Sequence, residues 1–186
     1  MPAQTDIAPE PAIHNRRDAA AQPITTCLWF DREAEEAASF YVKVFTDGGH
    51  SGKIRRIARF GRAGAKASGQ PEGSVMTVEF ELDGSVFLGL NGGPVFKPSP
   101  ATSFIVSCQN QEEIDHFWSR LSEGGKPSRC GWIDRDRFGI SWQVVPWNMG
   151  DYACDPDAAR AERVMGAVMK MSKLDLAELQ RAYDGE

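Results

Sequence analysis

The sequence has few histidines and no closely spaced cysteine pair, which limits the metal chemistry it can support. Of its 186 residues, 3 are histidine and 4 are cysteine. The cysteines stand at 27, 108, 130 and 154, form no CxxC motif and have no histidine partner at zinc-ligand spacing. Cys27 and Cys108 lie within apolar segments, so we expect both to be buried, reduced thiols. No neighbouring histidine or helix start predicts a catalytic thiolate at any of the four.

Long apolar runs and basic clusters are also missing. No stretch approaches the roughly 20 apolar residues that a membrane-spanning helix needs. The formal net charge of −5 leaves no basic stripe that could neutralise nucleic-acid phosphates. The most basic segment, residues 53–62, alternates as the solvated face of a strand does. The sequence therefore predicts a cytoplasmic protein that binds neither membranes nor nucleic acid.

The composition divides the chain into three parts. Residues 1–22 are rich in Ala, Pro, Gln and charge and have no signal-peptide core, so they are predicted to be a disordered tail. Residues 23–150 are predicted to form the main domain. Residues 151–186 are predicted to be a helical extension, in which Asp155 caps a helix that begins with Pro156 and a shorter helix follows.

The first half of the domain alternates between strand and helix patterns. Strands are predicted at 24–30, 52–62, 75–82 and 85–90, and a helix at 32–45 with Asp31 as its N-cap. The Gly, Ala, Lys and Ser of residues 63–73 predict a loop. Asp83-Gly84 predicts a two-residue hairpin turn. The order is βαβββ.

The same pattern then starts again. A strand is predicted at 102–108, Asn110 with Glu113 forms a capping box, and a helical apolar stripe follows. Short strands at 127–130 and 132–134 precede a strand at 140–145 that Pro146 ends. A shift of 77 residues superimposes the two halves, which indicates internal duplication. The predicted fold class is α+β, with paired βαβββ modules (23–92 and 101–146) on one curved mixed sheet, helices outside and a cavity on the concave side.

Within the last strand, alternation separates Gln143 from the bulky apolar residues. Period two places Ser141, Gln143 and Val145 on one face and Trp142 with its apolar neighbours on the other. We therefore expect Gln143 to point into any ligand cavity.

Four segments resemble one protein family. They are residues 24–41, the run FELDGSVFLGLNGGP at 80–94, CGWIDRDRFGISWQVVP at 130–146, and ERVMGAVMKMSKLDLAEL at 162–179. Together they resemble the PhnB-like proteins of the vicinal oxygen chelate superfamily, which includes glyoxalase I, extradiol dioxygenases and bleomycin-resistance proteins. The resemblance covers residues 23–182 and implies the paired-module fold and a homodimer.

The resemblance also implies where a metal site would lie. The superfamily's metal enzymes carry histidine and glutamate at positions that fall here on Thr26, Asn91 or its neighbour Leu90, Ser103 and Gln143. Neutral hydroxyl and amide oxygens are weak ligands for a first-row divalent ion, so we expect no metal. The family also carries the label of a 3-demethylubiquinone-9 3-methyltransferase. That chemistry needs S-adenosylmethionine, but no segment resembles its GxGxG turn between a strand and a helix, and residues 91–94 lie between two strands, so no cofactor is expected.

Three functions remain open. The first is a metal-free protein that binds an unidentified small molecule, although the same polar groups could instead satisfy one another in a filled core. The second is an enzyme, either a metal-dependent lyase or isomerase or a metal-free transferase, with Glu79 or Glu81 as acid or base; their alternation with apolar residues also fits a solvated face. The third is a dimeric module that recognises another protein. For the first, the expected lining is Thr26, Asn91, Ser103 and Gln143 as polar groups, with Trp29, Trp132 or Trp142 as aromatic walls.

Overall fold

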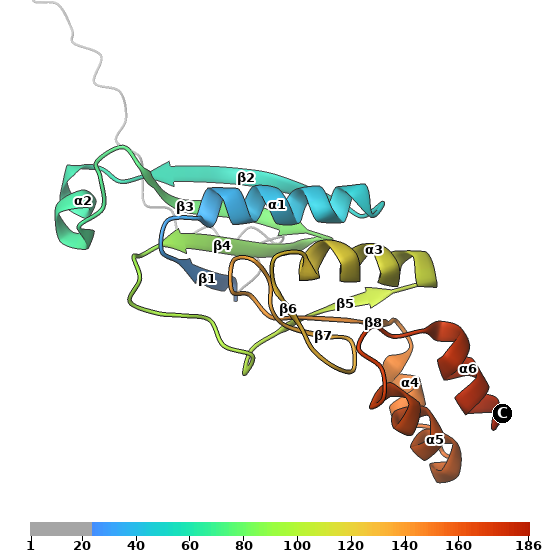
Figure 1. Ribbon diagram of the computed structural model, residues 1–186. Helices are drawn as coiled ribbons and strands as arrows, with labels where there is room; N and C mark the ends of the chain where they lie inside the picture. Colours follow the sequence, from blue (N-terminus) through green and yellow to red (C-terminus); the bar gives the residue numbers. More distant parts are fainter. Residues whose placement is uncertain (1–23) are drawn as a thin grey trace, which may run out of the picture.

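The computed structural model describes residues 24–186, so the predicted tail at 1–22 lies outside the described residues. It contains two modules with the predicted strand order, the first of which has an additional helix, followed by three helices (Figure 1). The first module comprises β1 (Thr26–Phe30), α1 (Ala34–Asp47), β2 (Gly52–Arg59), α2 (Arg62–Ser68), β3 (Val75–Leu82) and β4 (Ser85–Asn91). The second comprises β5 (Phe104–Cys108), α3 (Gln111–Ser122), β6 (Lys126–Pro127), β7 (Trp132–Arg135) and β8 (Trp142–Pro146). The extension consists of α4 (Met149–Ala153), α5 (Ala158–Val168) and α6 (Leu176–Asp184).

The strands form two four-stranded mixed sheets, one from each module. Their orders are β1-β4-β3-β2 and β5-β8-β7-β6. In both, the first strand pairs in parallel with the last, and the other pairs are antiparallel. The α+β class and the duplication are thus as predicted, but the eight strands form two separate ladders where one curved sheet was expected.

The hairpin between β3 and β4 follows directly from its turn residues. Asp83 and Gly84 both have positive φ, 44° and 77°. A two-residue turn with this handedness matches the twist of the strands it joins. The Asp83-Gly84 turn predicted from the sequence is confirmed.

One helix covers one face of each sheet. α1 packs on β2, β3 and β4, and α3 packs on β5, β7 and β8. The Asn110 side chain accepts a hydrogen bond from the Glu113 backbone N–H at 2.9 Å, as predicted for the start of α3. The opposite face of each sheet, here called the open face, carries no helix from either module.

Three local predictions are wrong, and one short helix was missed. Residues 62–68 form α2 where a loop was expected, because an alanine-rich turn closes on Gly69 in a left-handed conformation. α1 starts at Ala34 with Glu33 as its N-cap, since the Ala34 N–H is satisfied by the distant Asn91 side chain. α5 is capped by Asp157, two residues after the predicted cap. α4 was not predicted.

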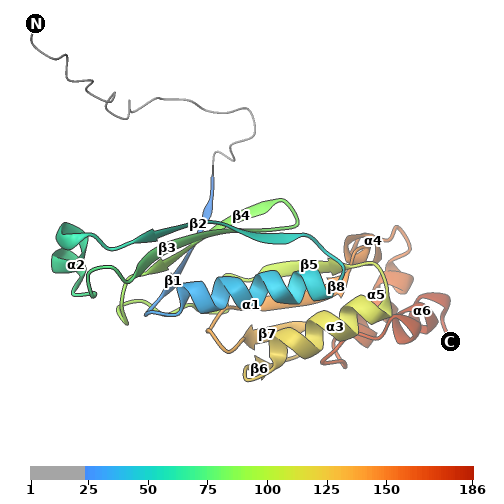
Figure 2. The same cartoon turned by 90° about the horizontal axis from the view of Figure 1, so that it is seen from above.

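A single hydrophobic core joins the two modules. It combines buried side chains of both sheets with those of α1 and α3, which lie side by side (Figure 2). Polar contacts cross the same boundary: the Tyr41 hydroxyl donates to Asp136 at 2.7 Å, and His116 Nε2 donates to the Val44 carbonyl at 2.8 Å. In residues 24–186, no ladder pairing connects the two sheets, so side chains hold the modules together.

The three C-terminal helices pack around a second, smaller core. Val145 of β8 contributes to it with Val164, Val168, Leu174 and Leu179. These helices lie at the opposite end of the molecule from α2 (Figures 1 and 2). None of the described helices combines the length and apolar character needed to span a membrane.

Candidate functional site

A pocket lies where the two modules meet, and we call it the junction pocket. Its volume is about 260 Å³. It is bounded by the edge strands β1 and β5, the two residues before β8 and the segment that connects the modules. The lining residues are Thr26, Cys27, Leu28, Trp29, Phe96, Lys97, Pro98, Ser99, Thr102, Phe104, Ile140 and Ser141.

Trp29 forms a fixed aromatic wall of this pocket. Its indole N–H donates to the Gly93 carbonyl at 2.8 Å, and its ring meets Phe96 edge to face at 4.9 Å. Gly92 lies directly against the ring, because a Cβ added there would stand 2.1 Å from a Trp29 ring carbon. The glycines after β4 thus pack against Trp29 and do not form a free turn that could cradle a phosphate or a cofactor.

Small polar groups complete the lining. Thr26, Ser99 and Thr102 bring hydroxyls to the pocket, and the Ser141 hydroxyl donates to the Asp134 carbonyl at 2.5 Å. The Cys27 thiol is exposed, which corrects the predicted burial. Cys27 projects from the open face, which no helix covers, whereas Cys108 is buried as predicted. Partial withdrawal from water raises the pKa of the Cys27 thiol.

The six predicted site residues fall into three places. Thr26 and Trp29 line the junction pocket. Ser103, Trp132 and Gln143 gather on the open face of the second sheet, where Trp132 pairs with Gln143 across the β7–β8 ladder and the Gln143 amide donates to the Ser103 hydroxyl at 2.8 Å. These three residues do not line the junction pocket. The third candidate wall, Trp142, is 2% exposed and belongs to the core.

Asn91 lies on the helix-covered face of the first sheet. Its carbonyl oxygen accepts from the Ala34 N–H at 2.9 Å, and its amide donates to the Val75 carbonyl at 3.0 Å. Asn91 is 4% exposed. Its side chain therefore fixes the start of α1 against β3 and β4.

The candidate acids Glu79 and Glu81 occupy the open face of β3 and are neutralised there by β2. Glu79 accepts from Arg56 Nε at 3.2 Å and lies 3.4 Å from Arg55 Nε, while Glu81 lies 3.4 Å from Lys53 Nζ. This ladder of opposite charges is typical of a solvated strand face.

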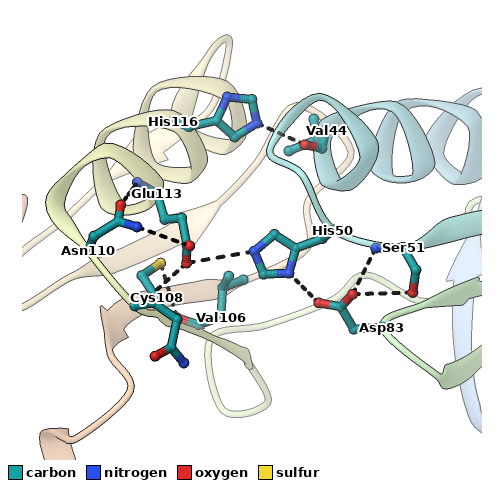
Figure 3. Close-up of polar contacts among 10 residues, drawn as sticks. Val44, His50, Ser51, Asp83, Val106, Cys108, Asn110, Glu113 and His116 are labelled. Carbon is teal, nitrogen blue, oxygen red and sulfur yellow. Dashed lines mark hydrogen bonds and ion pairs between the residues drawn. The ribbon is translucent and has the colours of Figure 1, made fainter.

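A further polar cluster is centred on His50 and bridges the modules (Figure 3). His50 Nδ1 lies 2.5 Å from Asp83 of the β3–β4 turn, and its Nε2 lies 3.7 Å from Glu113 of α3. The two carboxylates face opposite edges of the ring, so they do not converge on one point where an ion would sit. Over the part of the chain that the structure describes, no group of three or more His, Cys, Asp or Glu side chains is placed to hold a metal ion.

The positions that the resemblance implies for a metal do not suit one. Thr26, Asn91, Ser103 and Gln143 offer only neutral oxygen or amide groups, and first-row divalent ions favour imidazole or carboxylate. Moreover, Asn91 faces α1, whereas Ser103 and Gln143 bond to each other on an open face. This residue set does not fit the metal site of the superfamily's enzymes.

The connecting segment was missed by sequence reasoning. Residues 96–99 supply a third of the junction pocket's lining, although they belong to no strand or helix. The available signal was the length of the connection between two compact modules, together with its isolated aromatic residue Phe96. Long ordered connections between rigid elements are frequent binding segments.

Comparisons with known proteins agree with this architecture. The sequence profile of the 3-demethylubiquinone-9 3-methyltransferase family matches residues 22–145. The structure is similar to the PhnB protein of Bacillus cereus, a candidate 3-demethylubiquinone-9 3-methyltransferase, with 32% identity, a TM-score of 0.56, and coverage of 67% of this chain and 99% of that chain. It is also similar in fold to Pseudomonas aeruginosa PA1353, with 18% identity, a TM-score of 0.51, and coverage of 68% and 98%.

A more distant match is a glyoxylase/bleomycin resistance protein/dioxygenase domain from Frankia sp. EAN1pec, at 12% identity, a TM-score of 0.40, and coverage of 68% and 93%. No curated protein matched the chain. The profile match spans most of the chain, and the Bacillus relative is covered almost completely at 32% identity. The chain therefore belongs to the PhnB-like family, the family described as 3-demethylubiquinone-9 3-methyltransferase.

Proposed function

We propose that the protein binds a small molecule in the junction pocket and uses no metal to do so. The observation that carries this proposal is the lining of the pocket, in which Trp29 and Phe96 form an aromatic wall beside a few hydroxyl groups. Small-molecule sites usually combine apolar walls with a small number of polar anchors. The volume of about 260 Å³ suits a compact ligand.

Two enzymatic alternatives receive less support from the residues. A metal-dependent lyase or isomerase would need a charged or imidazole ligand set, and the positions for it carry neutral groups on different faces. The family's methyltransferase description would need a site for S-adenosylmethionine. The glycines at 92 and 93 are held against Trp29 and lead into a connecting segment, which gives such a cofactor no helix start to bind.

Binding can be tested with a neutral fluorescent probe, N-phenyl-1-naphthylamine, whose emission rises when it leaves water. We expect saturable binding to the wild-type protein and a loss of about tenfold in affinity for Trp29→Ala, since the variant removes one aromatic wall. Trp147→Ala is the matched control, because Trp147 is 59% exposed and lies outside the pocket. Equal affinities for the two variants would remove the junction pocket as the site.

The metal-dependent alternative has its own test. Elemental analysis of protein purified without chelator should find no stoichiometric divalent ion. A stoichiometric ion that is lost in Gln143→Ala would favour a recruited ligand set at the positions implied by the family and would contradict the proposal.

We further propose that the protein works as a homodimer in the cytoplasm. Support for the dimer comes from β5, whose Ile105 is 60% exposed on an open sheet face. All four cysteines are free thiols, which suits a reducing compartment. Light scattering coupled to size exclusion should give twice the chain mass, and Ile105→Glu should shift the protein toward monomer. A monomeric wild-type protein would refute the dimer.

A further inference from the structure

A second hollow adjoins the junction pocket, and we call it the basic groove. Its volume is about 580 Å³. Lys97 and Pro98 of the connecting segment line both hollows, and Gly139 of the groove is followed directly by Ile140 of the pocket. The lining residues of the groove are Lys97, Pro98, Pro100, Lys126, Asp134, Arg135, Phe138 and Gly139.

The charges of this groove do not cancel. Lys126 Nζ lies 2.9 Å from Asp134, and this contact lowers the pKa of the Asp134 carboxyl. Among the described residues, no ion pair includes Lys97 or Arg135, and Arg135 acts on the same Asp134 carboxyl from beyond ion-pair distance. Three cations and one carboxylate therefore face the same hollow.

This local excess of positive charge stands out on an acidic chain. The formal net charge of the protein is −5, and most described Lys and Arg side chains have a carboxylate partner, as Lys43, Lys53 and Lys173 do. A concave surface lined by one sign of charge concentrates ligands of the opposite sign. The positive charge of the groove favours a small acidic group, and the aromatic walls of the adjoining pocket favour the apolar part of a ligand.

We propose that the ligand is an apolar molecule that carries an acidic group, either carboxylate or phosphate. Its apolar body occupies the junction pocket against Trp29 and Phe96, and its acidic group reaches the basic groove, where Lys97 and Arg135 bind it. Lys97 has the central role because it lines both hollows. This inference rests on the proposed small-molecule function and adds the chemical class of the ligand.

A pair of probes with the same ring system separates charge from apolar binding. 1-Anilinonaphthalene-8-sulfonate carries an acidic group, and N-phenyl-1-naphthylamine is its neutral parent. We expect Lys97→Gln/Arg135→Gln to weaken sulfonate binding about fivefold, since each exposed charge contact contributes modestly. Binding of the neutral probe should stay within about twofold of wild type, because the pocket walls are unchanged. Arg62→Gln/Lys66→Gln removes the same charge from α2, outside both hollows, and should leave both affinities unchanged.

The outcomes distinguish the two proposals. If the neutral probe binds and depends on Trp29, but the groove variant binds the sulfonate as wild type does, the acidic-ligand inference is overturned and the pocket stands. If neither probe binds the wild-type protein, the proposed function itself fails.

Displacement of the neutral probe then identifies the acidic group. Octanoate and octyl phosphate are compared with 1-octanol, which has the same chain and no charge. Stronger displacement by either acid than by 1-octanol supports the inference. The acid that displaces the probe at the lower concentration then indicates whether the preferred group is carboxylate or phosphate. Displacement by 1-octanol that equals both acids contradicts it.

Discussion

The buried carboxylate of Asp136 offers the sharpest test of how the two modules are held together. Asp136 is 2% exposed and accepts four hydrogen bonds. Oδ1 accepts from the Phe138 and Ile140 N–H groups at 2.8 and 3.0 Å. Oδ2 accepts from the Tyr41 hydroxyl at 2.7 Å and the Trp142 indole N–H at 2.8 Å. One side chain thus joins its own turn, a core tryptophan and helix α1 of the other module.

Asp136→Asn keeps the shape of this side chain and removes one acceptor. The new NH2 group must face two of the four donors, and the Trp142 indole cannot accept a hydrogen bond. An orphaned buried donor costs about 1–3 kcal/mol, and charged hydrogen bonds of about 1.5–3 kcal/mol become weaker neutral ones. Removing a buried charge returns part of this loss. We expect a net decrease of about 2–4 kcal/mol in the free energy of unfolding.

Urea unfolding followed by tryptophan fluorescence measures this change. Asp134→Asn is the matched control, since it makes the same chemical change two residues away at a partly exposed ion pair with Lys126, worth about 0–1 kcal/mol. Tyr41→Phe removes a single donor and should cost about 1 kcal/mol, with coupling to Asp136→Asn in a double-mutant cycle. If the free energy of unfolding of Asp136→Asn lies within about 0.5 kcal/mol of the wild-type value, the proposed role of Asp136 at the module boundary is refuted.

Three further predictions follow from single contacts. Gly92→Ala should displace the Trp29 ring, lower the free energy of unfolding by about 1–3 kcal/mol and weaken binding of the neutral probe. Urea unfolding and fluorescence titration measure these two effects. Gly61→Ala is the control, because a Cβ at Gly61 meets no atom within 4 Å. Burial raises the pKa of Asp136, so the folded protein binds a proton at this carboxyl more tightly than the unfolded chain does. Proton binding therefore stabilises the folded state fully at pH values below the ordinary carboxyl pKa, and this stabilisation is lost as the pH rises through the pKa of the folded protein. Wild type should therefore gain stability relative to Asp136→Asn on acidification, and a pH-independent difference would contradict this. Burial raises the pKa of Cys108 to about 12, so a thiol reagent should modify Cys27 in the folded protein and Cys108 only after unfolding; a folded Cys27→Ser variant whose Cys108 reacts readily would contradict the assignment.

Most of the fold could be predicted because local patterns and tertiary structure agree. The apolar stripe of α3, its Asn110 cap and the Asp83-Gly84 turn are each determined by residues close together in the chain. The start of α1 was missed because its first N–H is satisfied by Asn91, which is 57 positions away. No local signal reveals such a partner.

The candidate site was less predictable, because alternation along a strand gives two faces without saying which one is covered. Cys27 sits in an apolar segment and is nevertheless exposed, since it lies on the face that α1 does not cover. Aligning the two halves by 77 residues also matched Thr26 with Ser103. A shift of 77 aligns the two helices correctly, since Val44 and Leu121 are both buried. In a strand, however, successive side chains point to opposite faces, so an odd shift aligns a residue of the covered face with one of the open face. Only the paired registers reveal which polar side chains can meet.

The connecting segment between the modules has a consequence for how this fold diversifies. Residues 96–99 line the junction pocket, and Lys97, Pro98 and Pro100 line the basic groove, yet this segment lies in no strand of either sheet. Each duplicated module completes its ladder without them. If the two hollows bind the proposed ligand, mutation of this segment changes ligand selectivity while the two ladders keep their stability. A graft of residues 96–100 from a relative would then transfer that relative's ligand preference without changing either ladder.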